Sequence, residues 1–100
     1  PMTPDPFAAD YAEARERFLE LAAAAGARWD TERHPHERAP GGAPLCLDHA
    51  WLGPQDADTV VLSLSGTHGD EGPGGSAVQR SWLAAAGRAP LPAGVAVLLV

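Results

Sequence analysis

The residues best suited to chemistry in this sequence are His68 and Glu71, which stand three positions apart in a glycine-rich segment. Two residues at this spacing on one turn can direct an imidazole nitrogen and a carboxylate oxygen at the same point. Zinc accepts such donors, and a catalytic zinc site typically combines three protein ligands with one open water position. Beside a neutral histidine and one carboxylate the ion keeps enough charge to acidify a bound water. The spacing therefore predicts a pair of zinc ligands.

The segments on either side of this pair indicate how it is positioned. Residues 60–64 form a short, β-rich apolar run, which predicts a buried central strand. Ser76, with Gln79 three positions later, has the pattern of a helix N-cap. Glycines recur at every third position between the strand and the helix: Gly66, Gly69 and Gly72. Function in α/β proteins tends to lie at such strand-to-helix turns, beyond the carboxyl end of a strand.

A second His-x-x-Glu spacing, from His34 to Glu37, provides an internal comparison. It stands in a polar segment that contains Pro35 and has no apolar strand before it, so we predict a solvated loop. For His68 and Glu71 an alternative without a metal stays open. Glu71 would then be an acidic residue in the first turn of a helix, where it complements the helix dipole.

The remaining pattern predicts an α/β fold with a mixed sheet. A helix is expected from Asp10, which forms a capping pair with Glu13, to Gly26, which ends it. Apolar residues at helical spacing mark the side of this helix that faces the core: Phe7, Tyr11, Ala14, Phe18, Leu21, Ala22 and Ala25. A strand is expected over residues 27–33, with Trp29 buried in it.

Residues 34–44 are predicted to form a loop, and residues 45–52 alternate as a second strand that pairs antiparallel with the first. The apolar run 95–100 is typical of a strand buried on both faces of a parallel sheet. Strand, helix and strand from 60 to 100 then make a crossover unit with parallel strands. Because a chain rarely stops within its own core, we expect residues 1–100 to be the amino-terminal portion of one larger domain.

Composition excludes several classes of function. The net charge of −6, with seven Arg and no Lys, argues against nucleic acid or an anionic membrane as a partner. The absence of lysine also excludes a Walker-type phosphate loop. A single cysteine, Cys46, excludes an internal disulfide and predicts a reducing compartment, the cytoplasm. No apolar segment approaches the length of a membrane span.

Three blocks, residues 7–15, 48–54 and 65–72 with 75–76, resemble an uncharacterised bacterial family, a domain of unknown function related to the zinc carboxypeptidases. The resemblance implies an amino-terminal fragment of a carboxypeptidase-like fold in which His68 and Glu71 are the first two zinc ligands. It places a third ligand, a substrate-binding arginine and a general-base glutamate beyond residue 100. Asp70 stands where an apolar residue is expected, and this departure concerns the shape of the pocket.

The function implied is that of a zinc-dependent hydrolase of the metallocarboxypeptidase or amidase type, in which a metal-activated water attacks an amide bond of a peptide or small-molecule substrate. Two alternatives stay open. One is a serine enzyme of the α/β-hydrolase type with His68 and Gly69 in its oxyanion loop. The other is a metal-free relative that only binds a peptide or sugar.

Overall fold

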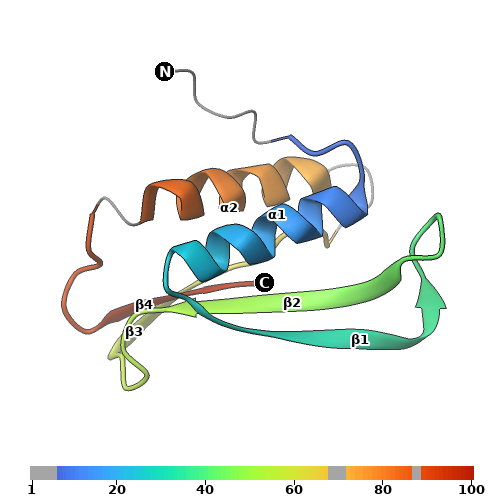
Figure 1. Cartoon of the computed structure of the whole chain (residues 1–100). Helices are drawn as coiled ribbons and strands as arrows, with labels where there is room; N and C mark the ends of the chain where they lie inside the picture. Colours follow the sequence, from blue (N-terminus) through green and yellow to red (C-terminus); the bar gives the residue numbers. More distant parts are fainter. Residues whose placement is uncertain (1–6, 68–71, 87–88) are drawn as a thin grey trace.

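Two helices pack side by side on one face of a four-stranded mixed sheet (Figure 1). The computed structural model describes residues 7–67, 72–86 and 89–100. The order of strands across the sheet is β1-β2-β4-β3. Along the chain the elements are α1 (Tyr11–Ala24), β1 (Arg28–Arg38), β2 (Pro44–Leu52), β3 (Thr59–Ser63), α2 (Gly72–Ala86) and β4 (Val95–Leu99).

Both ends of α1 form as the sequence predicts. The Asp10 carboxylate caps the helix by accepting a hydrogen bond of 2.8 Å from the Glu13 backbone N–H. Glu13 in turn accepts from the N–H of Ala9, at 2.8 Å. At the other end Gly26 has a φ of 78°, and its N–H donates to the Ala23 carbonyl. A left-handed glycine of this kind satisfies the last carbonyl groups of a helix and stops it.

The β1–β2 hairpin is longer than the sequence predicts. β1 and β2 pair antiparallel, as expected, but β1 continues through residues 34–38, so the prediction of a loop there is wrong. The strand lies at the edge of the sheet, where Pro35 costs no ladder hydrogen bond, and its register shifts between Arg33 and Arg38. The prediction that Trp29 is buried is also wrong, since this residue is 47% exposed on the edge strand.

The carboxyl-terminal half contains the predicted crossover unit, in which β3 and β4 pair parallel. The central position, however, belongs to β4, which lies between β2 and β3. β3 is therefore an edge strand, and the prediction of a buried central strand over residues 60–64 is wrong. Val61 and Leu62 are 52% and 56% exposed. A run of apolar residues predicts a strand, but neighbouring segments decide whether that strand is covered.

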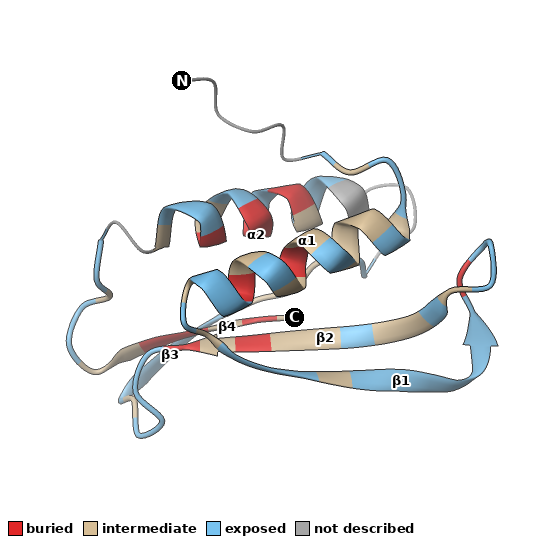
Figure 2. Cartoon of the chain, viewed as in Figure 1, coloured by how far each residue is buried: buried red, intermediate tan, exposed pale blue. Residues whose placement is uncertain are grey.

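The core lies between the helices and the middle of the sheet (Figure 2). β2 alternates as predicted, with Ala50 and Leu52 buried against the helices. The buried residues that form this cluster are Phe18, Ala22, Ala50, Leu52, Leu83, Val97 and Leu99. Phe7, predicted to belong to the apolar stripe of α1, is instead exposed ahead of the helix.

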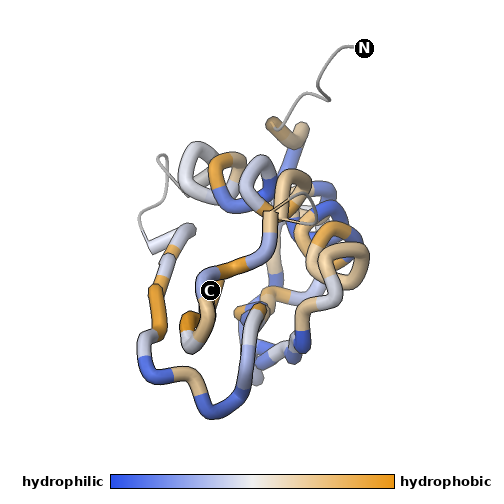
Figure 3. Tube along the Cα trace, turned by 90° about the vertical axis from the view of Figure 1, so that its left-hand side faces the viewer, coloured by the Kyte–Doolittle hydropathy of each residue, from blue (hydrophilic) through white to orange (hydrophobic). Residues whose placement is uncertain are grey.

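The opposite face of the sheet is not covered by any described helix. Because side chains alternate along a strand, residues in register with Leu98 of β4, such as Trp51 and Leu62, point away from the helices. Leu47, Val60 and Leu62 are exposed, and we call this uncovered surface the open sheet face. Figure 3 shows apolar segments both in the helical layer and in the strands beneath it.

Candidate functional site

The predicted ligand pair stands between two described segments. His68 and Glu71 themselves lie outside the described residues. The chain leaves the carboxyl end of β3 at Ser63, passes through Thr67, and resumes at Gly72 as the first residue of α2. This is the strand-to-helix connection that the sequence predicts. Its described beginning lies at the carboxyl ends of two parallel strands, β3 and β4, where α/β folds commonly place their ligands.

The start of α2 differs from the prediction. The helix begins at Gly72, so Ser76 is inside the helix and is not its N-cap. The Ser76 hydroxyl accepts a hydrogen bond of 2.5 Å from Arg80, four residues later on the same helix. A proline in the first turn is compatible with the earlier start, because the first N–H groups of a helix have no intrahelical partner. The predicted Ser76–Gln79 capping pair is therefore wrong.

Gln79, which the sequence suggested as a capping residue, is a buried side chain beneath this connection. Only 3% of it is exposed. Its amide nitrogen donates to the carbonyl oxygens of Ser63 and Val100, at 3.0 and 3.2 Å. Its amide oxygen accepts from the Ser65 hydroxyl at 3.0 Å. One side chain of α2 thus contacts the ends of both parallel strands and the residue that begins the connection.

A glycine in α2 holds the helix close to the same segment. A β-carbon added at Gly75 would lie 3.2 Å from the β-carbon of Ser65, closer than two such atoms ordinarily approach. Gly66, the residue after Ser65 in the sequence, has a φ of 74°, a left-handed conformation that favours glycine. Of the three regularly spaced glycines, Gly66 therefore provides a sharp turn of the backbone, while Gly69 lies outside the described residues. The close packing of the helix comes from Gly75, which is not one of the three.

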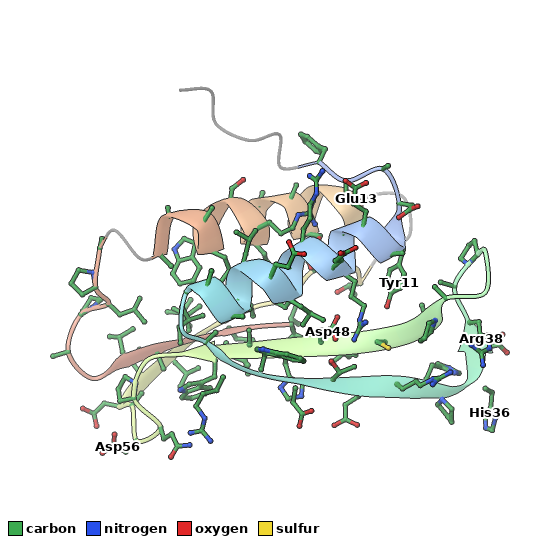
Figure 4. All side chains as sticks on the ribbon, viewed as in Figure 1. Tyr11, Glu13, His36, Arg38, Asp48 and Asp56 are labelled. Carbon is green, nitrogen blue, oxygen red and sulfur yellow. The ribbon has the colours of Figure 1, made fainter. Side chains whose placement is uncertain are left out.

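A buried cation, Arg80, lies between the two helices. It is 2% exposed. Burial lowers its pKa, the nearby charge of Arg17 lowers it further, and Glu13 acts in the opposite direction. The first turn of α1 and the middle of α2 are thus electrostatically connected. Glu13, which is labelled in Figure 4, also forms an ion pair with Arg17 along α1.

A second polar cluster fixes α1 on the sheet. Arg15 of α1 forms an ion pair with Asp48 of β2, with Nε 2.9 Å from Oδ2. Thr31 of β1 donates to the other carboxylate oxygen at 2.6 Å. Burial lowers the pKa of Arg15, but the hydrogen bond and charge of Asp48 outweigh it, so the net shift is upward and the guanidinium stays charged. This cluster connects α1, β1 and β2.

Tyr11 provides a further anchor beside that cluster (Figure 4). Its hydroxyl donates to the Cys46 carbonyl at 2.9 Å and accepts from the Cys46 N–H at 2.8 Å. β4 pairs with β2 only from Ala50 to Leu52, so the Cys46 backbone lies beyond that pairing. The hydroxyl therefore satisfies backbone groups at the uncovered edge of β2.

The second His-x-x-Glu segment lies on the exposed part of β1. The Nδ1 atom of His34 accepts hydrogen bonds from the N–H groups of His36 and Glu37, at 3.2 and 2.9 Å. The His34 and His36 rings are 6.4 Å apart between centroids and lie edge to face. One nitrogen of His34 is thus used within the hairpin. Residues 7–67, 72–86 and 89–100 contain no group of three or more His, Cys, Asp or Glu placed to hold a metal ion.

Comparison with known proteins identifies the family. Residues 7–100 match the model of DUF2817, described as a protein of unknown function, and the chain belongs to this family. No curated protein matches the chain. Among solved structures, the chain is similar to the glutaminyl cyclase of Fimbriiglobus ruber, with a TM-score of 0.54 and 15% sequence identity.

The likeness to the glutaminyl cyclase covers 88% of this chain and 35% of that protein, so the chain spans about a third of its relative's length. At this level of identity the likeness concerns the fold. It confirms the predicted fold class, α/β with a mixed sheet. Within the described residues, neither α1 nor α2 has the length and apolar character that crossing a bilayer would require.

Proposed function

We propose that the complete protein is a zinc-dependent hydrolase of the metallocarboxypeptidase or amidase type. Its substrate would be a peptide or a small molecule with an amide bond. The observation that carries the proposal is that a His-x-x-Glu sequence stands, in chain order, between β3 and α2. The described residue Ser65, three positions before His68, hydrogen-bonds to Val100 at the carboxyl end of the parallel strand β4. The similarity of the fold to a glutaminyl cyclase supports it.

The donor types of this connection suit zinc. His68 and Glu71 would hold the ion, because a neutral imidazole nitrogen and a carboxylate oxygen are both ordinary zinc ligands. When bound, zinc would acidify a water molecule for attack on a carbonyl group. The described side chains at the base of the connection, Ser63, Ser65 and Gln79, are neutral. They would hold the chain in place without adding a charge that competes with the ligands.

The rest of the proposal follows from the similarity and the composition. A third ligand and the general base would lie outside residues 1–100, as in the relatives that the sequence resembles. The net charge of −6 makes nucleic acid and anionic membranes unfavourable partners. The free thiol of Cys46 suits a reducing compartment, which we propose to be the cytoplasm.

The proposal is tested by changing one histidine at a time in the complete protein. His68→Ala should abolish bound zinc together with activity on a panel of short peptides and N-acyl amino acids. His34→Ala is the matched control, since it removes a histidine with the same spacing to a glutamate from the exposed hairpin. Zinc content is measured by elemental analysis. Loss of zinc in His34→Ala and retention in His68→Ala would show that the wrong motif had been chosen.

A further inference from the structure

We propose that Gln79 is the positioning residue of the β3–α2 connection. Through Ser63, Ser65 and Val100 its side-chain amide would fix the backbone from which the segment containing His68 departs. This inference rests on the proposed zinc site for its functional consequence. Its structural part, the attachment of the start of the connection to α2 and β4, rests on described residues alone.

The hydrogen bonds of Gln79 use all of its polar atoms. The amide nitrogen reaches the Ser63 carbonyl, the Val100 carbonyl and, at 3.3 Å, the Ser63 hydroxyl. The amide oxygen accepts from Ser65. A buried amide with a partner for every donor and acceptor is held in one orientation, since any rotation would leave a buried polar atom unpaired.

The two carbonyls that Gln79 contacts also carry the last hydrogen bonds between β3 and β4. The Val100 N–H donates to the Ser63 carbonyl at 2.9 Å, and the Ser65 N–H donates to the Val100 carbonyl at 2.9 Å. Both bonds join backbone groups and do not include the Gln79 side chain. Removing the amide should therefore leave the two strands paired in the folded molecule, although the ends of the pairing would open more often.

Gln79 supplies hydrogen bonds that connect the strand ends to the helix. Ser65 is held to α2 by the hydrogen bond from its hydroxyl and by the close approach of Gly75. Only Gly66 and Thr67 separate Ser65 from His68 in the sequence. We therefore expect a change in the position of Ser65 to alter the start of the segment that leads to His68. Outer groups that orient metal ligands typically matter by about 10–100-fold in metal affinity.

The experiment compares Gln79→Met with Gln55→Met in the complete protein. Methionine has nearly the same length as glutamine and removes every hydrogen bond of the amide. Gln55 is the matched control, because it is exposed in the turn between β2 and β3, at the amino-terminal end of β3. The first measurement is amide hydrogen exchange at Ser65 in the metal-free protein. The second is zinc affinity by chelator competition, with the absorption spectrum of the cobalt-substituted protein.

For Gln79→Met we expect the Ser65 amide to exchange about tenfold faster, because the end of the β3–β4 pairing opens more readily. Zinc affinity should fall by about tenfold or more, and the d–d bands at saturating cobalt should shift. A loss of stability alone would not move the bands of a fully occupied site. Gln55→Met should match the wild type in all three measurements.

Two negative results have different meanings. If Ser65 exchange in Gln79→Met equals that of the wild type, the positioning role is overturned, whatever the metal does. If the wild-type protein binds no zinc, the proposed function fails, and the exchange measurement still decides the role of Gln79. Faster exchange with unchanged zinc affinity and unchanged cobalt bands would overturn the inference that the Gln79 side chain positions the ligand segment.

Discussion

The ion pair between Arg15 and Asp48 should be a principal attachment of α1 to the sheet, and Asp48→Asn tests this. The substitution keeps the shape of the side chain and one oxygen, which can still accept the hydrogen bond from Thr31. If that oxygen keeps its hydrogen bond from Thr31, the new NH2 group of the asparagine takes the place of Oδ2. In the wild type Oδ2 lies 2.9 Å from Nε of Arg15. A donor would then face a donor, and a partly buried cation would lose its counter-charge.

The expected cost follows from the burial of the two side chains, which are 27% exposed for Arg15 and 10% for Asp48. Hydrogen bonds to charged groups contribute about 1.5–3 kcal/mol, and breaking a fully buried pair costs more. Water can reach the exposed part of Arg15, so the loss of stability should lie near the lower end of the range for hydrogen bonds to charged groups. We expect Asp48→Asn to reduce the free energy of unfolding by about 2 kcal/mol.

Urea denaturation of the complete protein, followed by circular dichroism, measures this effect. Asp56→Asn is the matched control, because Asp56 is exposed in the turn between β2 and β3 and should change stability by less than about 0.5 kcal/mol. If the two variants were equally stable, the Arg15–Asp48 pair would contribute no more than an ordinary surface charge. The role assigned to it in attaching α1 would then be refuted.

Two further predictions concern the edge of β2 and the open sheet face. Tyr11→Phe should destabilise the protein by about 1–2 kcal/mol in the same urea assay, because it leaves both backbone groups of Cys46 without their hydroxyl partner; an unchanged midpoint would show that water replaces it fully. Residues 1–100 expressed alone should self-associate in sedimentation through the open sheet face, and Leu62→Lys should shift them towards monomer; a wild-type monomer with a cooperative melting transition would contradict this.

The sequence was sufficient for features that depend on near neighbours in the chain. The capping of α1 by Asp10 and its end at Gly26 involve contacts within five residues, so local pattern predicts them. The alternation along β2 and the parallel pairing of β3 with β4 also follow from pattern and connection length. The proposed ligands His68 and Glu71 come from sequence alone and remain a prediction.

Tertiary structure decided which predicted elements are covered. A strand has the same local sequence pattern whether it lies at the edge or at the centre of a sheet, so the exposure of β3 and of Trp29 in β1 could not be predicted. The length of β1 was missed because its polar residues pair with β2 through backbone atoms, for which side-chain pattern carries little signal.

Gln79 shows how the two kinds of information combine. It stands four residues before the core residue Leu83, so the sequence places a polar side chain on the helix face that points inward. Its partners, Ser63, Ser65 and Val100, are between 14 and 21 residues away in the chain. Folding alone brings these carbonyl and hydroxyl groups around one amide, because the ends of β3 and β4 meet only when the sheet has formed.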